Sequence, residues 1–206
     1  MKIQLAIDRV SLEQANRLAK KIGPFVDIVE VGTSLIKEFG MSSVISVKHS
    51  CPNTAVLADL KTMDEGAYEF KCAYRSGADI ATVMGSASLS TISVCAQVAR
   101  EERREYMVDL MEVPVEKTSV LIKKFPDAIF CVHLPTDRHD IDLKDLIGQI
   151  RLPLKDAKRL ALAGGITPDV MEQLNRSRFE IAIVGGAITK VQNPVKSAQE
   201  FCRLAK

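Results

Sequence analysis

The sequence predicts a closed (β/α)8 TIM barrel, an α/β fold that forms a single compact domain over residues 1–206. Short apolar segments alternate with longer amphipathic ones, as in parallel strands covered by helices. Eight such units share 206 residues, so each takes about 26 residues, the size of a compact strand-helix unit. An acidic residue also begins or directly precedes every second predicted strand and is followed by apolar residues, which indicates barrel repetition.

The predicted strands are short apolar runs of four to six residues. They cover residues 3–7, 27–31, 55–60, 79–84, 106–110, 128–133, 159–163 and 181–184. No linker or low-complexity stretch interrupts the alternation. We therefore expect one domain rather than two.

The segments between these strands have helical periodicity. Ser11 is a candidate N-cap for a helix whose apolar residues recur at helical spacing until Gly23-Pro24 stops it. Pro168 and Pro194 stand at first-turn positions of two later helices. Each strand is thus expected to be followed by a helix that packs against the barrel.

Composition excludes several classes of protein. The net charge is +2, and the basic residues are scattered, so nucleic-acid binding is not expected. No apolar run reaches the roughly 18 residues of a membrane span. The five cysteines are an odd number without a C-x-x-C pair, and they indicate reduced thiols. A cytoplasmic location is expected.

Ionisable side chains recur where the predicted strands end. In a (β/α)8 barrel the active site lies at the carboxyl ends of the strands, so these side chains should meet at one mouth. Any one strand-end carboxylate could instead cap the next helix, and a single histidine could be a core residue. The candidate set is Asp8, Glu30, Asp59, Lys61, Asp109 and His133.

The residue types suggest distinct roles. Asp59 and Lys61 are two apart, and in an extended strand they point the same way. Glu30 and Asp59 offer oxygen ligands of the kind that Mg²⁺ binds. Lys61 could stabilise a developing oxyanion. His133 titrates near neutral pH, as a proton shuttle must.

Two glycine pairs follow the last two predicted strands. Gly164-Gly165 comes after the seventh and Gly185-Gly186 after the eighth. Loops at these two places often hold phosphate in barrel enzymes, because backbone N–H groups can approach it closely. A single pair would indicate only a turn, but both pairs together predict a phosphate site.

The segment D-L-K-T-M-D at 59–64 matches the D-x-K-x-x-D motif of the orotidine monophosphate decarboxylase superfamily. Further matching segments run along nearly the whole chain: L-A-I-D, I-V-E-V-G, V-D-L-M, C-V-H, A-G-G-I and I-V-G-G-A-I-T. Within the superfamily the chain most resembles the 3-hexulose-6-phosphate synthase family, and 3-keto-L-gulonate-6-phosphate decarboxylases are its close relatives. The resemblance implies an Mg²⁺-dependent barrel that forms an enediolate and works as a homodimer with active sites at the interface.

Departures from the motifs separate the members. Orotidine monophosphate decarboxylases carry a lysine in place of Glu30 and use no metal, so the carboxylate implies the metal-binding branch. Ketogulonate-phosphate decarboxylases have arginines where this chain has Thr136 and Gly186. Asp137, four residues after His133, follows the synthase pattern, although the Leu-Pro between them departs from it.

The resemblance implies an aldol addition of formaldehyde to D-ribulose 5-phosphate. Mg²⁺ on Glu30 and Asp59 would bind the sugar's oxygens, and His133 would take the C1 proton. Asp59 and Asp64 would hold Lys61 charged and oriented, with Asp64 reaching the neighbouring subunit's site. Asp8 and Asp109 would bind substrate hydroxyls, and the glycine pairs would hold the phosphate.

Two alternatives stay open at this point. The chain could decarboxylate 3-keto-L-gulonate 6-phosphate, or it could be a phosphosugar-binding barrel without catalysis. The pathway is not fixed by the residues. Ribulose-phosphate epimerases, a third kind of phosphosugar barrel, would need metal-binding histidines on early strands, where this sequence has none.

Overall fold

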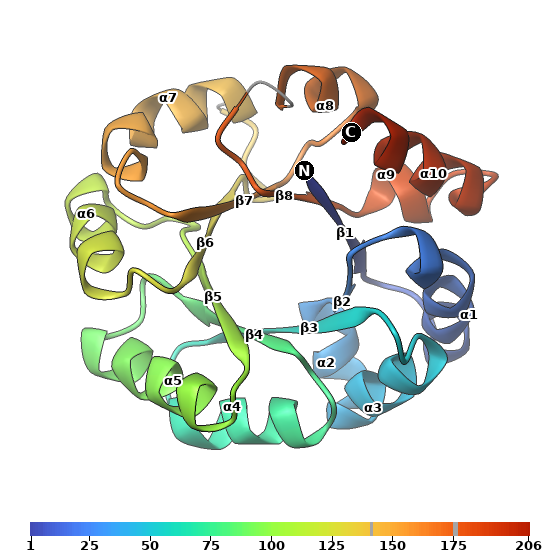
Figure 1. The fold of residues 1–206 in the computed structure, drawn as a ribbon, viewed down its shortest axis with the longest axis horizontal. Helices are drawn as coiled ribbons and strands as arrows, with labels where there is room; N and C mark the ends of the chain where they lie inside the picture. Colours follow the sequence, from blue (N-terminus) through green and yellow to red (C-terminus); the bar gives the residue numbers. More distant parts are fainter. Residues whose placement is uncertain (141, 175–176) are drawn as a thin grey trace.

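The eight strands close into one parallel barrel in chain order (Figure 1). The computed structural model describes residues 1–140, 142–174 and 177–206. The predicted strands are confirmed, with bounds that move by at most two residues. The strands are β1 Lys2–Ile7, β2 Ile28–Val31, β3 Ala55–Thr62, β4 Ile80–Met84, β5 Glu105–Asp109, β6 Ile129–His133, β7 Arg159–Ala163 and β8 Ile181–Val184.

Helices form the outer ring of the barrel (Figure 1). Two of them, α2 and α3, lie between β2 and β3, separated by Gly40 at a φ of 61°. The helices are α1 Leu12–Ile22, α2 Thr33–Phe39, α3 Met41–Ser50, α4 Gly66–Arg75, α5 Leu89–Glu101, α6 Val115–Lys124, α7 Leu143–Leu154, α8 Pro168–Leu174, α9 Gly186–Thr189 and α10 Pro194–Leu204, with a 3₁₀ turn η1 at Gly23–Phe25.

The predicted helix signals are confirmed by their hydrogen bonds. The Ser11 side chain accepts from the backbone N–H of Gln14 and caps α1. At α10 the Asn193 side chain accepts from the N–H of Lys196, with Pro194 in the first turn. Such caps satisfy N–H groups that have no partner inside the helix. Local sequence therefore fixes where these helices begin.

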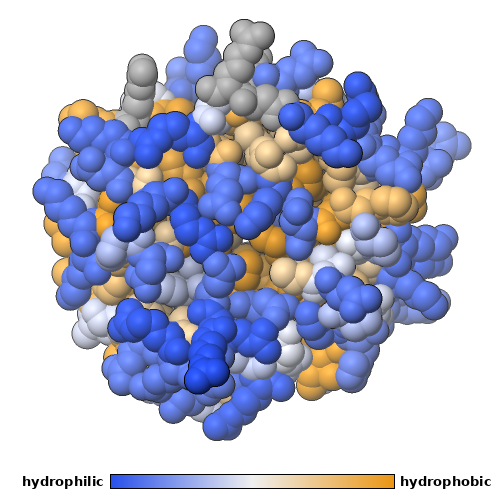
Figure 2. Space-filling model, in the orientation of Figure 1, coloured by the Kyte–Doolittle hydropathy of each residue, from blue (hydrophilic) through white to orange (hydrophobic). Residues whose placement is uncertain are grey.

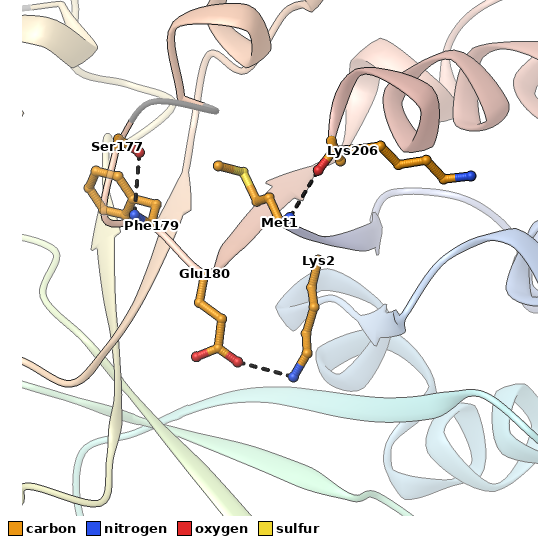
Figure 3. Close-up of a pocket in the computed structure, with 7 residues that line it drawn as sticks. Met1, Lys2, Ser177, Phe179, Glu180 and Lys206 are labelled. Carbon is orange, nitrogen blue, oxygen red and sulfur yellow. Dashed lines mark hydrogen bonds and ion pairs between the residues drawn. The ribbon is translucent and has the colours of Figure 1, made fainter.

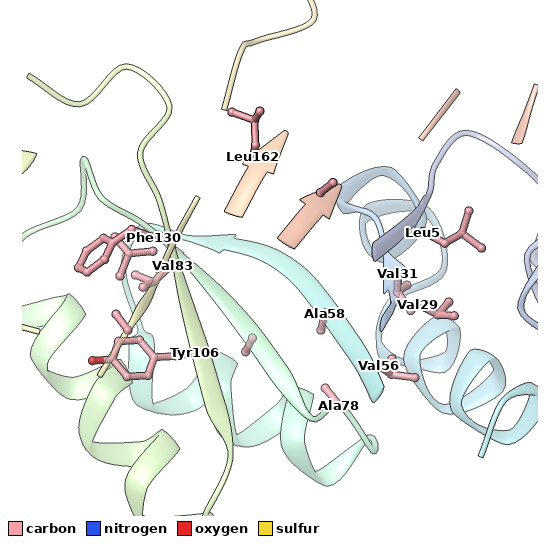
Figure 4. Close-up of a cluster of buried hydrophobic side chains, with 14 of the residues drawn as sticks. Leu5, Val29, Val31, Val56, Ala58, Ala78, Val83, Tyr106, Phe130 and Leu162 are labelled. Atoms are coloured by element: carbon pink, nitrogen blue, oxygen red, sulfur yellow. The ribbon is translucent and has the colours of Figure 1, made fainter. Parts of the chain in front are cut away.

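Two hydrophobic clusters hold the barrel together. The larger joins the outward side chains of the strands, including Leu5, Val31 and Phe130, to the inner faces of the helices (Figure 4). The smaller contains only strand residues, such as Leu57 and Met107, and fills the barrel interior. Since successive strand residues point to opposite faces, buried parallel strands are apolar on both sides. Polar interior residues are thus exceptions that need a reason.

Ion pairs close the amino-terminal end of the barrel. Lys2 Nζ lies 3.0 Å from Glu180 Oε1, and Arg159 Nε lies 3.2 Å from Glu180 Oε2. A cavity of about 500 Å³ opens beside them, lined in part by Met1 and Phe179 (Figure 3). This end lies opposite the carboxyl ends of the strands, where barrel enzymes place their chemistry. The pairs link the start of β1 to β7 and to the residue before β8.

Charged and polar side chains cover most of the face seen in Figure 2, and exposed hydrophobic side chains lie in small areas between them. Across the described ranges, we find no helix with both the length and the apolar character needed to span a bilayer. All five cysteines are free thiols.

Candidate active site

An ionic chain of four side chains crosses the carboxyl end of the barrel. Lys61 Nζ lies 2.9 Å from Asp59 Oδ2 and 3.0 Å from Asp109 Oδ2. The same Asp109 oxygen lies 2.8 Å from His133 Nδ1. The Asp109 side chain is only 4% exposed, whereas Lys61 and His133 keep 23% and 21% of theirs in contact with solvent. Lys61 and His133 can therefore reach a substrate.

Lys61 reaches Asp59 through an irregular backbone rather than through regular strand alternation. Ala58 pairs with Ala81 and Thr62 pairs with Val83, so β3 advances four residues while β4 advances two. Lys61 itself has a φ of 50°, which is uncommon for a residue with a side chain. The prediction that Asp59 and Lys61 lie together is confirmed, but its geometric reason was wrong.

Thr82 on β4, which was not among the predicted site residues, stabilises this irregular segment. Its buried hydroxyl accepts from the Lys61 backbone N–H at 2.9 Å and donates to Asp59 Oδ1 at 2.8 Å. Thr33 donates to the other Asp59 oxygen at 2.7 Å. Asp59 is thereby fixed between two hydroxyls and one ammonium. A threonine in an apolar strand, opposite the charged motif, is the signal that could have identified it.

Replacing Thr82 by valine keeps the shape of the side chain and removes both hydrogen bonds. We expect a loss of about 1–3 kcal/mol in the free energy of unfolding, because a buried N–H and a carboxylate oxygen lose their partner. Urea titration of Thr82→Val against the wild type measures it. Thr91→Val in α5 removes only an exposed hydroxyl contact to Ser88 and should change stability much less; equal losses would contradict the role of Thr82.

The charged side chains of the ionic chain stabilise one another's charged forms. Burial would lower the pKa of Lys61, but the carboxylates of Asp59 and Asp109 raise it, so Lys61 is an ammonium. Burial would raise the pKa of Asp109, but the hydrogen bond from His133 and the Lys61 charge lower it to about 2. Because a carboxylate only accepts, His133 Nδ1 must be its donor. Nε2 is then left without a proton in the neutral ring, as a base requires.

Glu30 lies inside the barrel, on the strand next to Asp59. Its side chain is buried, and its pKa is raised to about 8 by burial and by the nearby charges of Asp59 and Asp8. Gln4 Nε2 donates to Glu30 Oε2 at 2.5 Å. Carboxylates that repel one another in a buried place are suited to a divalent cation, which would neutralise them.

The donor set fits Mg²⁺ in particular. Among the residues that the structure describes, no three His, Cys, Asp or Glu side chains gather where they could hold a metal ion. Glu30 and Asp59 offer two carboxylates on neighbouring strands. Mg²⁺ is commonly bound by one or two carboxylates and completes its octahedron with water and substrate oxygens.

The raised pKa of Glu30 predicts a pH dependence of stability without divalent cations. The folded carboxyl group, at about 8, holds its proton more tightly than the unfolded one, at 4.5. Stability should therefore be highest below 4.5 as far as this group is concerned, and should fall as pH rises toward about 8. Mg²⁺ should raise the melting temperature more at pH 8 than at pH 6, because it binds the charged form.

Thermal unfolding of the wild type and Glu30→Gln at several pH values, with and without Mg²⁺, checks this expectation. Glu30→Gln should lose both the decline with pH and the stabilisation by Mg²⁺. An unchanged response to pH and Mg²⁺ in that variant would show that Glu30 is not the responsible group.

Asp8 is held at the mouth by the start of α2. Its Oδ1 accepts from the Ser34 hydroxyl at 2.7 Å and from the Ser34 backbone N–H at 3.2 Å. A Cβ on Gly32 would lie 2.2 Å from Asp8 Oδ2, so any larger residue after Glu30-Val31 would displace the Asp8 carboxylate. Asp8 remains half-buried, and among the described residues no side chain donates to its Oδ2, in keeping with a substrate contact.

The structure places Asp64 away from the ionic chain. Asp64 is exposed beyond the end of β3, and Lys61 pairs with Asp109 instead. Within one chain Lys61 pairs with Asp59 and Asp109, because the irregular segment directs it across the barrel, so the role of Asp64 at a neighbouring subunit's site stays a prediction. Met63 and Tyr68, which are 53% and 70% exposed, flank Asp64. An exposed carboxylate between exposed apolar side chains suits contact with a second subunit.

The two glycine pairs lie at the same end of the barrel. Gly164 has a φ of 91°, and a Cβ there would stand 2.4 Å from the Leu134 carbonyl oxygen, so only glycine fits. Gly165 has a φ of 66° with open space where a Cβ would project. Gly185 precedes α9, and Gly186 is its first residue. The backbone here is accessible to a ligand, whereas phosphate binding itself stays a prediction.

A cavity of about 550 Å³ opens between the loops that follow Asp109 and His133. Arg138 links these loops: its Nη1 lies 3.0 Å from Glu112 Oε1, and its Nε lies 2.9 Å from Asp140 Oδ1. Asp137 is exposed on the same loop and also lines the cavity. The loop after His133 thus forms one wall of the mouth.

Comparison with known proteins finds similarity along the whole chain. The family model described as "Orotidine 5'-phosphate decarboxylase / HUMPS family" matches residues 1–201. A 3-hexulose-6-phosphate synthase from Mycobacterium gastri is 35% identical, over 98% of each chain. A crystal structure of a 3-hexulose-6-phosphate synthase covers 100% of both chains with a TM-score of 0.91 and 33% identity.

A 3-keto-L-gulonate-6-phosphate decarboxylase from Vibrio cholerae O1 biovar El Tor is more distant. It is 25% identical, with a TM-score of 0.86, and covers 99% of this chain and 96% of its own. The shared fold, the charged motif of β3 and the full-length similarity all indicate the same family. The chain belongs to the orotidine 5'-phosphate decarboxylase / HUMPS family, and its similarity within that family is to 3-hexulose-6-phosphate synthases.

Proposed function

We propose that the protein catalyses the aldol addition of formaldehyde to D-ribulose 5-phosphate, giving D-arabino-hex-3-ulose 6-phosphate, and the reverse reaction. The observation that carries the proposal is a carboxylate, Glu30, beside the ionic chain of Asp59, Lys61, Asp109 and His133. The full-length similarity to 3-hexulose-6-phosphate synthases supports the same activity.

The ionic chain can move and stabilise the charges of this reaction. His133 Nε2 removes a proton from C1 of the sugar, while Asp109 fixes the ring and stabilises the imidazolium that forms. The electron pair of the broken C–H bond moves into an enediolate. Lys61, held charged by two carboxylates, lies where it can neutralise that oxyanion. C1 then attacks the formaldehyde carbon, and the proton on His133 is available to the new alkoxide.

Glu30 and Asp59 would hold Mg²⁺, which when bound supplies Lewis-acid stabilisation of the sugar's developing negative charge. The hydroxyls of Thr33 and Thr82 keep the Asp59 carboxylate in one orientation. Gln4 donates a hydrogen bond to the Glu30 carboxylate. This chain therefore contributes two fixed oxygen donors, and the substrate can complete the coordination.

The remaining groups would bind the rest of the sugar. Asp8 would accept a hydrogen bond from a substrate hydroxyl. Asp109 would do the same, in addition to its contacts with Lys61 and His133. The Gly164-Gly165 and Gly185-Gly186 loops would hold the phosphate through backbone N–H groups.

We also propose a homodimer in the cytoplasm, with each active site at the interface. Met63, Asp64 and Tyr68 form an exposed patch directly after the catalytic strand β3. A partner chain would cover the two apolar side chains and bring Asp64 to a second site. The five free thiols support a reducing compartment.

The activity is tested by following formaldehyde consumption with ribulose 5-phosphate and Mg²⁺. We expect consumption that EDTA abolishes and Mg²⁺ restores, and none in Lys61→Ala. No consumption above that control would reject the proposal. Release of CO₂ from 3-keto-L-gulonate 6-phosphate in its place would assign the decarboxylase reaction, and binding of ribulose 5-phosphate without turnover would indicate a non-catalytic phosphosugar barrel.

A further inference from the structure

Gln4 is a polar side chain inside the apolar barrel. It lies on β1, fully buried, and its backbone pairs with Ile28 of β2 and Ile183 of β8. The smaller hydrophobic cluster surrounds this level of the barrel. A buried amide in such surroundings is costly unless its donors and acceptors are satisfied. Its presence is therefore informative about what it contacts.

The amide is satisfied on one side only. Gln4 Nε2 donates to Glu30 Oε2 at 2.5 Å, whereas Gln4 Oε1 is buried without a hydrogen-bond partner. In the described part of the chain only one other buried side-chain oxygen or nitrogen, Oδ1 of Asn16, is in that position. An apolar side chain would avoid this cost, so the donation to Glu30 is the interaction that accounts for an amide here.

The charges around Glu30 show what the donation does. Asp59 and Asp8 both disfavour a charged Glu30, and Lys61 only partly compensates them. An N–H donor favours the carboxylate form and fixes one of its two oxygens. The second oxygen of Glu30, its Oε1, then has a defined direction. Groups that orient a metal-ligating carboxylate in this way typically change metal affinity by about 10–100-fold when removed.

We propose that Gln4 is a positioning residue that holds Glu30 in the orientation for binding a divalent cation. This inference rests on the proposed metal site, and it assigns to Gln4 no contact with substrate. The unpaired Oε1 makes the same side chain an acceptor for a buried water, since water commonly satisfies such atoms. Gln4 thus lies between the apolar interior of the barrel and the charged side chains at its carboxyl end.

The test is the affinity for Mn²⁺, measured by the electron paramagnetic resonance signal of the free ion, in the wild type, Gln4→Met and Asn16→Leu. Methionine fills a similar volume without donating. Asn16 is the matched control, because its Nδ2 also bonds another element, Ser46 of α3, on the outside of the barrel. Activity at increasing Mg²⁺ is measured in parallel, to separate an effect on cation binding from one on the maximal rate.

We expect Gln4→Met to bind Mn²⁺ about 10–100-fold more weakly, while its rate approaches that of the wild type at saturating Mg²⁺. Asn16→Leu should lose some thermal stability and keep its Mn²⁺ affinity. If Gln4→Met does not fold, Gln4→Ala, which leaves room for water, takes its place. Unchanged Mn²⁺ affinity in a folded Gln4 variant would overturn the role of Gln4 alone; no Mn²⁺ binding by the wild type would overturn the metal site with it.

Discussion

Lys61→Met is expected to lose activity by about 100–1,000-fold, since it removes the ammonium of the ionic chain where negative charge develops. Asp59 and Asp109 would lose the ammonium that lies 2.9 and 3.0 Å from their oxygens. Removing one partner of a buried ion pair typically costs about 3–5 kcal/mol, so folding should weaken as well. The rate of formaldehyde consumption and urea unfolding measure the two effects.

Lys37→Met is the control for this substitution. Lys37 is an exposed residue of α2. It should leave both activity and stability close to those of the wild type. A Lys61→Met protein that is folded by circular dichroism and still active within tenfold of wild type would contradict the role of Lys61 in stabilising the oxyanion.

Asp109→Asn is expected to lower the maximal rate by about 10²–10⁴-fold, because the wrong tautomer of a catalytic histidine costs an effect of this size. Asp109 Oδ1 accepts from the Met111 N–H, so the asparagine oxygen should take that place. Its NH₂ group would then face Lys61 and His133, where the carboxylate now accepts. A donor in that position favours the His133 tautomer that cannot act as a base through Nε2.

The same substitution changes how the free energy of unfolding depends on pH in the acid range. The folded pKa of Asp109, at about 2, lies below its ordinary value of 3.8. Its contribution to stability is therefore present above 3.8 and lost as pH falls through about 2, and Asp109→Asn should remove it. Asp127→Asn, just before β6 at the opposite end of the barrel, is the control. Equal rates in Asp109→Asn and the wild type would exclude the proposed tautomer mechanism.

The barrel could be predicted from sequence because its signals are local. Apolar runs of strand length, caps such as Ser11 and Asn193, and helix-starting prolines each depend on a few neighbouring residues. The ends of the strands could be predicted for the same reason. The strand ends in turn identified the side chains that meet at the mouth. The closed barrel brings together residues that are more than 100 positions apart in the chain.

The contacts between those side chains could not be predicted in the same way. The extra residues of β3 depend on its pairing with β4, and this pairing directs Lys61 to Asp109 rather than to Asp64. Thr82 and Gln4 act across neighbouring strands, so their roles depend on register that single strands do not encode. Polar residues inside otherwise apolar strands were the signal available for both.

Exchange of the C1 hydrogens of ribulose 5-phosphate tests the central claim, that this site forms an enediolate with His133 as the base. The sugar is incubated with protein and Mg²⁺ in D₂O, without formaldehyde, and its C1 protons are followed by NMR. Because one base acts from one face, we predict deuterium at one of the two C1 positions, and none with Lys61→Met or Asp109→Asn. Consumption of formaldehyde by a protein that leaves both C1 protons in place would contradict the mechanism.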